Sequence, residues 1–241
     1  MGFTRVDNDP TVATGSVPAW SFSTLKQMAT CPYSVYLSKI KKHKQPPAKA
    51  LIRGSNVHDM AENYLKGITL EVPEEFSQWT PEFNRLRDLT AAGTCWPEKE
   101  LSFDKEWQPT SWFASETWCR FKADVIVRED ETSYRIIDWK TGRKFGNEYQ
   151  HADQLKYYAV ALGMAIPEAD FISASMAYLD HGTETLDKSF SREEISYFLP
   201  LVTERGKAFT DRTEFPATPS DQACRWCGMS GFCEFSVAKK K

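Results

Sequence analysis

The clearest helical pattern in the chain follows Gly54 and Ser55. Apolar residues recur there at intervals of three and four positions, which is the spacing of one face of an α-helix. The residues of this stripe are Val57, Met60, Ala61, Tyr64 and Leu65. His58 and Glu62 lie beside the stripe, one turn apart. The pattern predicts an amphipathic helix with a histidine close to its buried face.

Periodic apolar positions favour further helices within residues 21–44, 81–91, 150–163 and 192–212. We expect the first of these segments to form two short helices, because Cys31-Pro32 interrupts its pattern. Gly163 is expected to end the helix that starts near residue 150, since glycine commonly follows the last turn.

Between residues 99 and 139 the pattern changes to short runs rich in aromatic and β-branched residues, which is typical of strands. Four strands are expected, in the segments KELSFDKEW, SWFASETW, RFKADVIV and YRIIDW. The last two flank a charged segment, 128–132, with the length of a hairpin loop. This hairpin places Asp124 and Asp138 on neighbouring antiparallel strands. With a fifth strand at 171–179, the elements predict an α/β fold in which helices flank a mixed central β-sheet.

Composition limits the function classes. The 241 residues carry 30 basic and 33 acidic side chains, a formal net charge of -3, which argues against coating nucleic acid over the whole surface. A local basic groove remains compatible with this charge. The apolar stretches are too short to cross a bilayer, and residues 1–20 lack the pattern of a secretory signal, so we expect a cytoplasmic protein without membrane contact. The expected organisation is a flexible tail at 1–20, one domain at 21–236 and a basic tail at 237–241.

The segment Ile-Asp-Trp-Lys combines an acid and a base. Strand alternation sends Asp138 and Lys140 to the same face, beside Asp124 on the adjacent strand. Two carboxylates can hold Mg²⁺ or Mn²⁺, and phosphodiester hydrolysis needs a metal-activated water together with a cation that stabilises the developing charge. Taken alone, Asp-x-Lys is more often an exposed ion pair. His58 alone is likewise more often an ordinary histidine on a helix face.

The order of these residues along the chain is more informative than any one of them. In that order the chain resembles the PD-(D/E)xK nuclease superfamily, in particular its RecB-like branch, which includes CRISPR-adaptation and bacteriophage exonucleases. The resemblance covers residues 21–236 and implies a restriction-endonuclease-like core. The matching motifs are G-x-x-x-H at Gly54–His58, the second acid at Asp124, D-x-K at Asp138 and Lys140, and Q-x-x-x-Y at Gln154 and Tyr158.

The resemblance implies a role for each matched residue. Lys140 would position the attacking water or stabilise the transition state, while Gln154 and Tyr158 would steady the site and the nucleic-acid backbone. The chain departs from the family at Phe121 and Ala123, where glycine and proline are frequent. The implied metal ligands are His58, Asp124, Asp138 and the carbonyl of Trp139.

Four cysteines suggest a second metal site. Cys224, Cys227 and Cys233 form C-x2-C-x5-C, and Cys31 precedes Cys224 by 192 intervening residues. In a reducing compartment such thiols indicate ligation or burial, and both zinc and an iron–sulfur cluster accept four thiolates. The split arrangement resembles the iron–sulfur branch of the superfamily. That resemblance implies a 4Fe-4S cluster that staples a helical cap built from 21–45 and 216–236.

The implied function is that of a divalent-metal-dependent deoxyribonuclease. The resemblance points to exonucleolytic hydrolysis of single-stranded DNA or DNA ends, in recombination, repair or processing, with recombination or CRISPR-adaptation-type proteins as partners. The resemblance also implies a bacterial or phage-encoded protein. A non-catalytic iron–sulfur nucleic-acid-binding accessory protein is the competing function, and Cys95 and Cys119 fit buried, unligated thiols. The candidate nucleic-acid-binding residues are Lys41, Lys42, Lys44 and Arg53, although a solvated basic face explains them equally well.

Overall fold

The computed structural model describes residues 11–44, 47–142 and 144–238. The chain forms two compact units. Unit 1 comprises Met1–Pro47 and Glu204–Lys241, and unit 2 comprises Ala48–Thr203. The four candidate cluster ligands, Cys31, Cys224, Cys227 and Cys233, lie in unit 1, whereas every residue of the matched nuclease motifs lies in unit 2. None of the described helices combines the length and apolarity needed to span a membrane.

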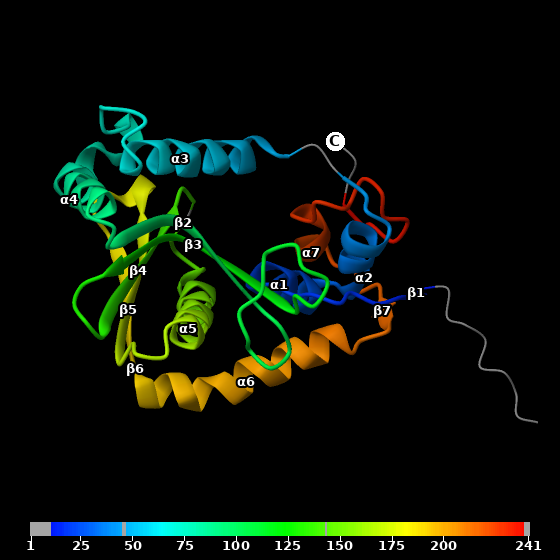
Figure 1. The fold of residues 1–241 in the computed structure, drawn as a ribbon. Helices are drawn as coiled ribbons and strands as arrows, with labels where there is room; N and C mark the ends of the chain where they lie inside the picture. The colour runs from blue at the N-terminus through cyan, green and yellow to red at the C-terminus, as the bar shows by residue number, and fades with distance from the viewer. Residues whose placement is uncertain (1–10, 45–46, 143, 239–241) are drawn as a thin grey trace, which may run out of the picture. The chain divides into compact units, whose positions relative to one another are not determined.

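Unit 2 is built on a five-stranded sheet in the order β2-β3-β4-β5-β6 (Figure 1). Its strands are β2 Cys95–Phe103, β3 Cys119–Arg128, β4 Ser133–Lys140, β5 Phe171–Tyr178 and β6 Thr185–Ser191. The pair β4·β5 is parallel and the other pairs are antiparallel, which confirms the predicted mixed sheet. The predicted hairpin between β3 and β4 is also confirmed.

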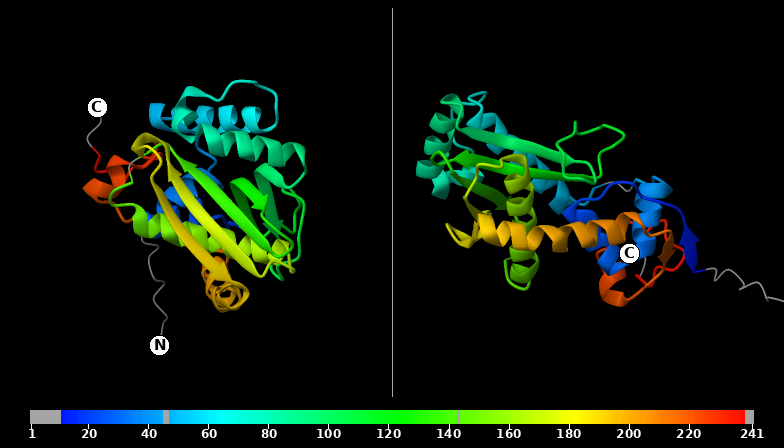
Figure 2. Two further views of the ribbon diagram at one scale, coloured as in Figure 1. Left: turned by 90° about the vertical axis from the view of Figure 1, so that its left-hand side faces the viewer. Right: turned by 60° about the horizontal axis from the view of Figure 1, so that its bottom comes forward.

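Helices flank the sheet, as the sequence predicts (Figure 2). Apolar residues of α3 (Lys49–Leu65) and α4 (Thr80–Ala91) pack against one face, which presents alternate residues of β3 and β4. Helix α5 (Glu148–Ala165) covers the other face. The short 3-10 helices η2 (Glu74–Trp79) and η3 (Leu179–His181) complete unit 2. Residues of the core between α3, α4 and the sheet include Val57, Ala61, Tyr64, Phe83, Val125, Ile137 and Trp139.

Two helices extend beyond the patterns that predict them. Helix α3 begins at Lys49, ahead of Gly54, so the glycine lies within the helix. Helix α5 continues past Gly163 to Ala165. A Cβ at position 163 would lie 2.9 Å from Cγ2 of Ile195, so this glycine permits close packing between helices instead of ending one.

The segment SWFASETW is a loop, and the strand predicted there is wrong. The Thr117 hydroxyl donates to the carbonyl of Ser111 at 2.9 Å. This carbonyl therefore bonds a side chain of its own segment, where in a strand it would bond the backbone of a neighbouring strand. Trp118 is nevertheless buried, with 1% of its surface exposed. Its aromatic side chain therefore anchors a loop. Strand β6, which the sequence analysis does not predict, forms the far edge of the sheet.

Unit 1 contains short elements from both ends of the chain. Strand β1 (Val12–Thr14) pairs antiparallel with β7 (Glu214–Pro216), and it falls within the segment for which we predicted a tail. Residues 1–10 and 239–241 lie outside the described residues. Helix α1 ends at Thr30 and α2 starts at Pro32, so the predicted break is confirmed. The described helices are α1 (Phe22–Thr30), α2 (Pro32–Val35), a π-helix η1 (Tyr36–Ile40), α7 (Asp221–Arg225) and the end of α6 (Arg192–Thr210).

Candidate metal and active site

Three acids occupy one row across three neighbouring strands. The β3·β4 ladder ends at Val125↔Ile137, so the next opposed pair is Asp124 and Asp138. In the β2·β3 ladder, Pro97 pairs with Val125 and Lys99 with Ala123, which leaves Glu98 opposite Asp124. We call Glu98, Asp124 and Asp138 the acid row. Each of its members lies where the regular ladder is interrupted.

Asp124 is buried and fully engaged. Its Oδ2 accepts a hydrogen bond from the backbone N–H of Trp139 at 2.7 Å, which replaces a bond of the sheet ladder. Its Oδ1 lies 3.1 Å from Nδ1 of His58, on α3. The buried apolar stripe of α3 packs on the sheet and so orients this histidine toward the acids. The amphipathic pattern that predicts the helix therefore also brings His58 into the site.

Glu98 is a candidate metal ligand that the sequence motifs do not single out. Its backbone has φ +52°, a left-handed conformation that is rare for a non-glycine residue and costly inside a strand. Its carboxylate lies 3.7 Å from Nδ1 of His58 and 2.6 Å from Nζ of Lys122. Sequence alternation does not distinguish Glu98 from the exposed Glu100 on the same strand. A strained conformation held by two cationic partners marks Glu98 as part of a site.

The structure brings three metal-ligating side chains together. Within the described residues, the only group whose ligand atoms all lie within 4.8 Å of one another is His58, Glu98 and Asp124. Asp138 and the carbonyl of Trp139 are outside this group. The imidazole nitrogen and carboxylate oxygens of this group suit a divalent cation such as Mn²⁺ or Mg²⁺.

Asp138 is buried, with 2% of its surface exposed, and its carboxylate faces both Lys140 and α5. Its Oδ2 is ion-paired with Nζ of Lys140, on the same strand. Its Oδ1 accepts a hydrogen bond from the hydroxyl of Tyr158 at 3.0 Å and a longer one from Nε2 of Gln154 at 3.4 Å. The amide of Gln154 also donates to the Tyr158 hydroxyl at 2.9 Å. The four motif residues of β4 and α5 thus form one connected network.

Burial and mutual charge perturb the ionisable groups of the site. Burial raises the pKa of Asp124, and the neighbouring Asp138 raises it further, against the opposing effect of His58. Burial lowers the pKa of His58, but its hydrogen bonds to Asp124 and Glu98 raise it to about 10 overall. Burial lowers the pKa of Lys140, while Asp138 and Asp124 raise it to a net value above normal. In the metal-free protein, His58 and Lys140 are therefore cations that balance the carboxylates.

The motif order, the acid row and the lysine paired with Asp138 agree with one family. A family model for the PD-(D/E)XK nuclease superfamily matches residues 19–234. This protein belongs to the PD-(D/E)XK nuclease superfamily. Membership implies a hydrolase that acts on nucleic acid.

Solved structures of low sequence identity resemble this nuclease. The protein SSO0001 is 16% identical with a TM-score of 0.47, over 94% of this chain and 91% of that one. A candidate exonuclease from Eubacterium rectale is 13% identical with a TM-score of 0.49, over 93% and 90%. An alkaline exonuclease from Laribacter hongkongensis is 11% identical with a TM-score of 0.25, over 80% and 92%. No curated protein matches the nuclease sequence significantly.

The cysteines of unit 1 line one cavity of about 640 Å³. Cys31 lies between α1 and α2, and its Sγ accepts from the backbone N–H of Thr218 at 3.5 Å. Sγ of Cys227 accepts from the N–H of Met229 at 3.4 Å. Among the described cysteines, no three sulfur atoms lie within 4.8 Å of one another. The residues lining this cavity include Cys31, Cys224, Cys227 and Cys233.

Cys95 and Cys119 are not among the residues that line that cavity. Both lie in strands of unit 2 and are buried, with 3% and 0% of their surface exposed. Burial raises the pKa of both thiols, which keeps them protonated and unreactive. Their surroundings are those of ordinary core residues.

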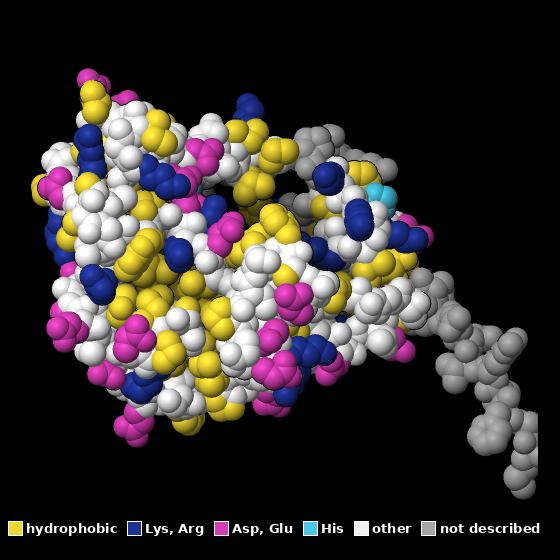
Figure 3. All heavy atoms as spheres, viewed as in Figure 1, with side chains coloured by type: hydrophobic (Ala, Val, Ile, Leu, Met, Phe, Trp, Pro, Cys, Tyr) yellow, Lys and Arg dark blue, Asp and Glu magenta, His cyan; other side chains and the backbone are white. Residues whose placement is uncertain are grey.

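The four candidate nucleic-acid-binding residues fall in different units. Lys41, Lys42 and Lys44 are exposed in unit 1, and Nζ of Lys41 lies 5.5 Å from the centre of the Tyr36 ring. Arg53, on α3, makes a bidentate ion pair with Asp180 at 2.6 and 2.8 Å, so its guanidinium already has an acidic partner. Lysine and arginine side chains are interspersed with acidic ones on the visible face of unit 2 (Figure 3).

Proposed function

We propose that this nuclease is a metal-dependent DNA exonuclease of the RecB-like type. The single observation that carries the hydrolytic assignment is the acid row, with Lys140 paired to its last member. The exonucleolytic mode, the choice of single-stranded DNA or DNA ends, and partners of the recombination or CRISPR-adaptation type follow from the motif order described above. A cytoplasmic, bacterial or phage-encoded enzyme of DNA processing fits this proposal.

The metal proposed for the site is Mg²⁺ or Mn²⁺. The residues that would hold it are His58, Asp124, Asp138 and the carbonyl of Trp139, and the structure adds Glu98 as a further candidate. The donor set fits, because oxygen ligands dominate and Asp124 is preoriented by the N–H of Trp139. When bound, the metal would activate water and screen the phosphate charge.

The side chains of the chain itself supply the remaining chemistry. Lys140 is a half-buried cation beside Asp138, where it can stabilise charge that develops on the phosphate oxygens. Tyr158 and Gln154 hold the orientation of the Asp138 carboxylate by donating to the same oxygen. These two residues lie on the rigid helix α5, so the carboxylate is positioned before substrate arrives.

We also propose that Cys31, Cys224, Cys227 and Cys233 ligate a 4Fe-4S cluster. A single tetrahedral zinc with Zn–S bonds of about 2.3 Å needs sulfur atoms roughly 3.8 Å apart. No three of the described sulfur atoms lie within 4.8 Å of one another, and the cavity that the four thiols line has room for a polynuclear cluster several ångströms across. Backbone N–H donors to the sulfurs of Cys31 and Cys227 provide the hydrogen bonds that tune such clusters.

Nucleic-acid binding by Lys41, Lys42 and Lys44 remains part of the proposal, because these exposed lysines can neutralise backbone phosphates. For Arg53 the proposal requires phosphate to compete with the carboxylate of Asp180. Guanidinium groups bind phosphate and carboxylate in the same bidentate geometry, so this exchange is chemically reasonable.

The decisive experiment compares linear and covalently closed single-stranded DNA of one sequence. Protein purified without oxygen is incubated with end-labelled linear DNA, or with the circle, in Mg²⁺ or Mn²⁺. An exonuclease degrades the linear strand and leaves the circle intact. Cleavage of the circle would instead indicate an endonuclease. Binding of both forms without cleavage would favour the non-catalytic accessory protein.

Glu98→Gln is expected to weaken divalent-metal affinity by roughly 10- to 100-fold, as removal of a metal-site partner commonly does. The reason is that Glu98 supplies one of the three grouped ligand atoms and also holds His58. The measurement is isothermal titration of Mn²⁺ into the metal-free protein. Glu100→Gln is the matched control, because this acid is exposed on the same strand. Equal Mn²⁺ affinity in the two variants would show that Glu98 does not contribute to metal binding.

A further inference from the structure

Two aromatic side chains lie exposed in the segment that connects two motif residues of the candidate site. Phe145 exposes 73% of its surface and Tyr149 exposes 87%. They fall between Lys140, at the end of β4, and Gln154 on α5. Side chains this exposed contribute little packing energy to the fold, and exposed aromatic rings near a functional site often serve recognition.

A tight turn presents Phe145. The backbone N–H of Asn147 donates to the carbonyl of Lys144 at 3.1 Å, which closes a four-residue turn with Phe145 in its second position. Gly146, in the third position, has φ +84° and so permits the turn. Helix α5 begins at Glu148, two residues after Gly146, and Tyr149 lies in its first turn. The turn and the helix start therefore display both rings from one short segment.

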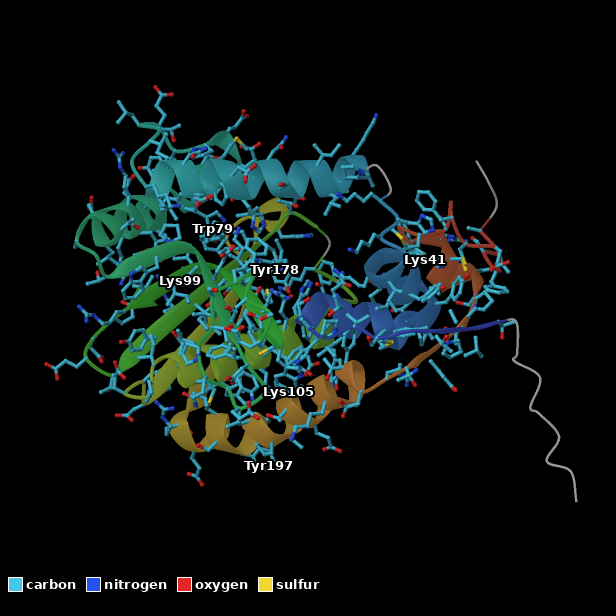
Figure 4. All side chains as sticks on the ribbon, turned by 45° about the vertical axis from the view of Figure 1, so that its right-hand side comes forward. Lys41, Trp79, Lys99, Lys105, Tyr178 and Tyr197 are labelled. Atoms are coloured by element: carbon cyan, nitrogen blue, oxygen red, sulfur yellow. The ribbon has the colours of Figure 1, made fainter. Side chains whose placement is uncertain are left out.

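A chain of ring contacts leads from Phe145 to Tyr178, at the strand position opposite Lys140. Tyr178 lies opposite Lys140 in the parallel β4·β5 ladder. The ring of Tyr178 is 6.3 Å from that of His181, which is 6.0 Å from that of Phe145. The Tyr178 hydroxyl also lies 2.8 Å from Nδ1 of His151, on α5. The rings of His181 and Tyr178 thus lie between Phe145 and the strand position opposite Lys140 (Figure 4 labels Tyr178).

Polar contacts hold this aromatic segment in place. Nζ of Lys144 lies 2.5 Å from a carboxylate oxygen of Glu184 and 5.6 Å from the centre of the Tyr178 ring. Asp180, one residue before His181, is held by Arg53. The side chains that precede Phe145 and His181 in the sequence are thereby fixed to the sheet and to α3. A fixed ring binds a flat ligand at a lower entropy cost than a mobile one.

We propose that Phe145 and Tyr149 form a stacking platform for unpaired nucleobases of the DNA strand whose phosphate reaches Asp138 and Lys140. This inference rests on the proposed nuclease function and adds a binding site to it. Bases expose their flat faces only when a strand is unpaired, so the platform selects single strands or frayed ends. Stacking tolerates every sequence because each base has an aromatic face.

The test is binding of single-stranded DNA to the full-length protein in EDTA, where metal-dependent hydrolysis is absent. The probe is a short strand with the fluorescent base 2-aminopurine near one end, since stacking quenches its emission. A second strand carries abasic sites at the same positions. The double variant Phe145→Ala/Tyr149→Ala is expected to bind the normal strand about 5- to 150-fold more weakly, the range that stacking on one ring supplies.

Matched controls come from exposed aromatic residues elsewhere in unit 2. Phe113 exposes 90% of its surface in a loop, and Tyr197 exposes 67% on α6, well apart from Tyr178 (Figure 4). The variants Phe113→Ala and Tyr197→Ala are expected to bind within twofold of the wild type. Phe145→Trp, which keeps an aromatic face, should retain quenching.

Comparing the binding of the normal and abasic strands tests the platform independently of nuclease activity. The platform is supported when the wild type prefers the normal over the abasic strand and the double variant shows no preference. That result supports it even when the wild type cleaves no DNA, in which case only the nuclease proposal fails. An undiminished preference in the double variant overturns the platform, including in a protein that cleaves DNA normally.

Discussion

Replacing Asp138 or Lys140 with alanine is expected to lower the rate of DNA cleavage by about two to three orders of magnitude. Removing one preorganised group that stabilises transition-state charge typically costs roughly 2.7 to 4 kcal/mol. Asp138 accepts hydrogen bonds from Tyr158 and Gln154 and is ion-paired with Lys140. Asp138→Ala removes the centre of this network, and Lys140→Ala removes its cation. The measurement is single-turnover cleavage of end-labelled DNA at saturating Mn²⁺.

The control pair for this experiment is Asp187→Ala and Lys188→Ala. These neighbouring residues form an acid and a base on the exposed edge strand β6, and neither contacts the acid row in the described structure. Their cleavage rates should match the wild type. Thermal unfolding of all four variants separates lost chemistry from lost structure. Wild-type turnover in folded Asp138→Ala or Lys140→Ala protein would refute the site.

Loss of any one of Cys31, Cys224, Cys227 and Cys233 is expected to remove the brown colour of the anaerobically purified protein and to destabilise it strongly. Because the four thiolates would bind one cluster, the loss of any one of them should have the same effect. A structural metal site contributes on the order of 10 kcal/mol to folding, an amount measured for zinc peptides, against about 1 kcal/mol for a typical substitution. A link across 192 residues also restrains the unfolded chain substantially.

Cys95→Ala and Cys119→Ala are the matched controls for the cluster, because these thiols are buried in unit 2. They should retain the colour and lose only the stability expected of a small core truncation. Iron, sulfide and zinc content, measured beside the visible spectrum, identify the metal. One zinc per chain and no iron would contradict the iron–sulfur proposal, while the acid row would be unaffected.

Local patterns predicted the elements that present the motifs. Hydrophobic alternation and a short charged connection are sufficient to define the β3–β4 hairpin, because both strands and their loop lie within about twenty residues. Asp124 and Asp138 could therefore be paired from the sequence. The stripe of α3 similarly placed His58 near the buried face of its helix.

The same local patterns failed where specific side-chain contacts decide the conformation. SWFASETW has the composition of a strand, but hydrogen bonds between its own residues make it a loop. Glycine commonly follows the last turn of a helix, but Gly163 lies inside α5, where the close approach of Ile195 leaves no room for a Cβ. Composition also cannot tell a core aromatic from an exposed one, so Phe145 and Tyr149 were not distinguished from the many buried rings.

The amino-acid sequence by itself determined which chemical groups are available and in what order, because motif spacing is a property of the chain. It specified the two aspartates, the lysine and the histidine. Only the tertiary structure decided that Glu98 joins them. Its left-handed backbone, its position opposite Asp124 and its contacts with His58 and Lys122 arise from strand register and helix packing, which bring together residues far apart in the chain.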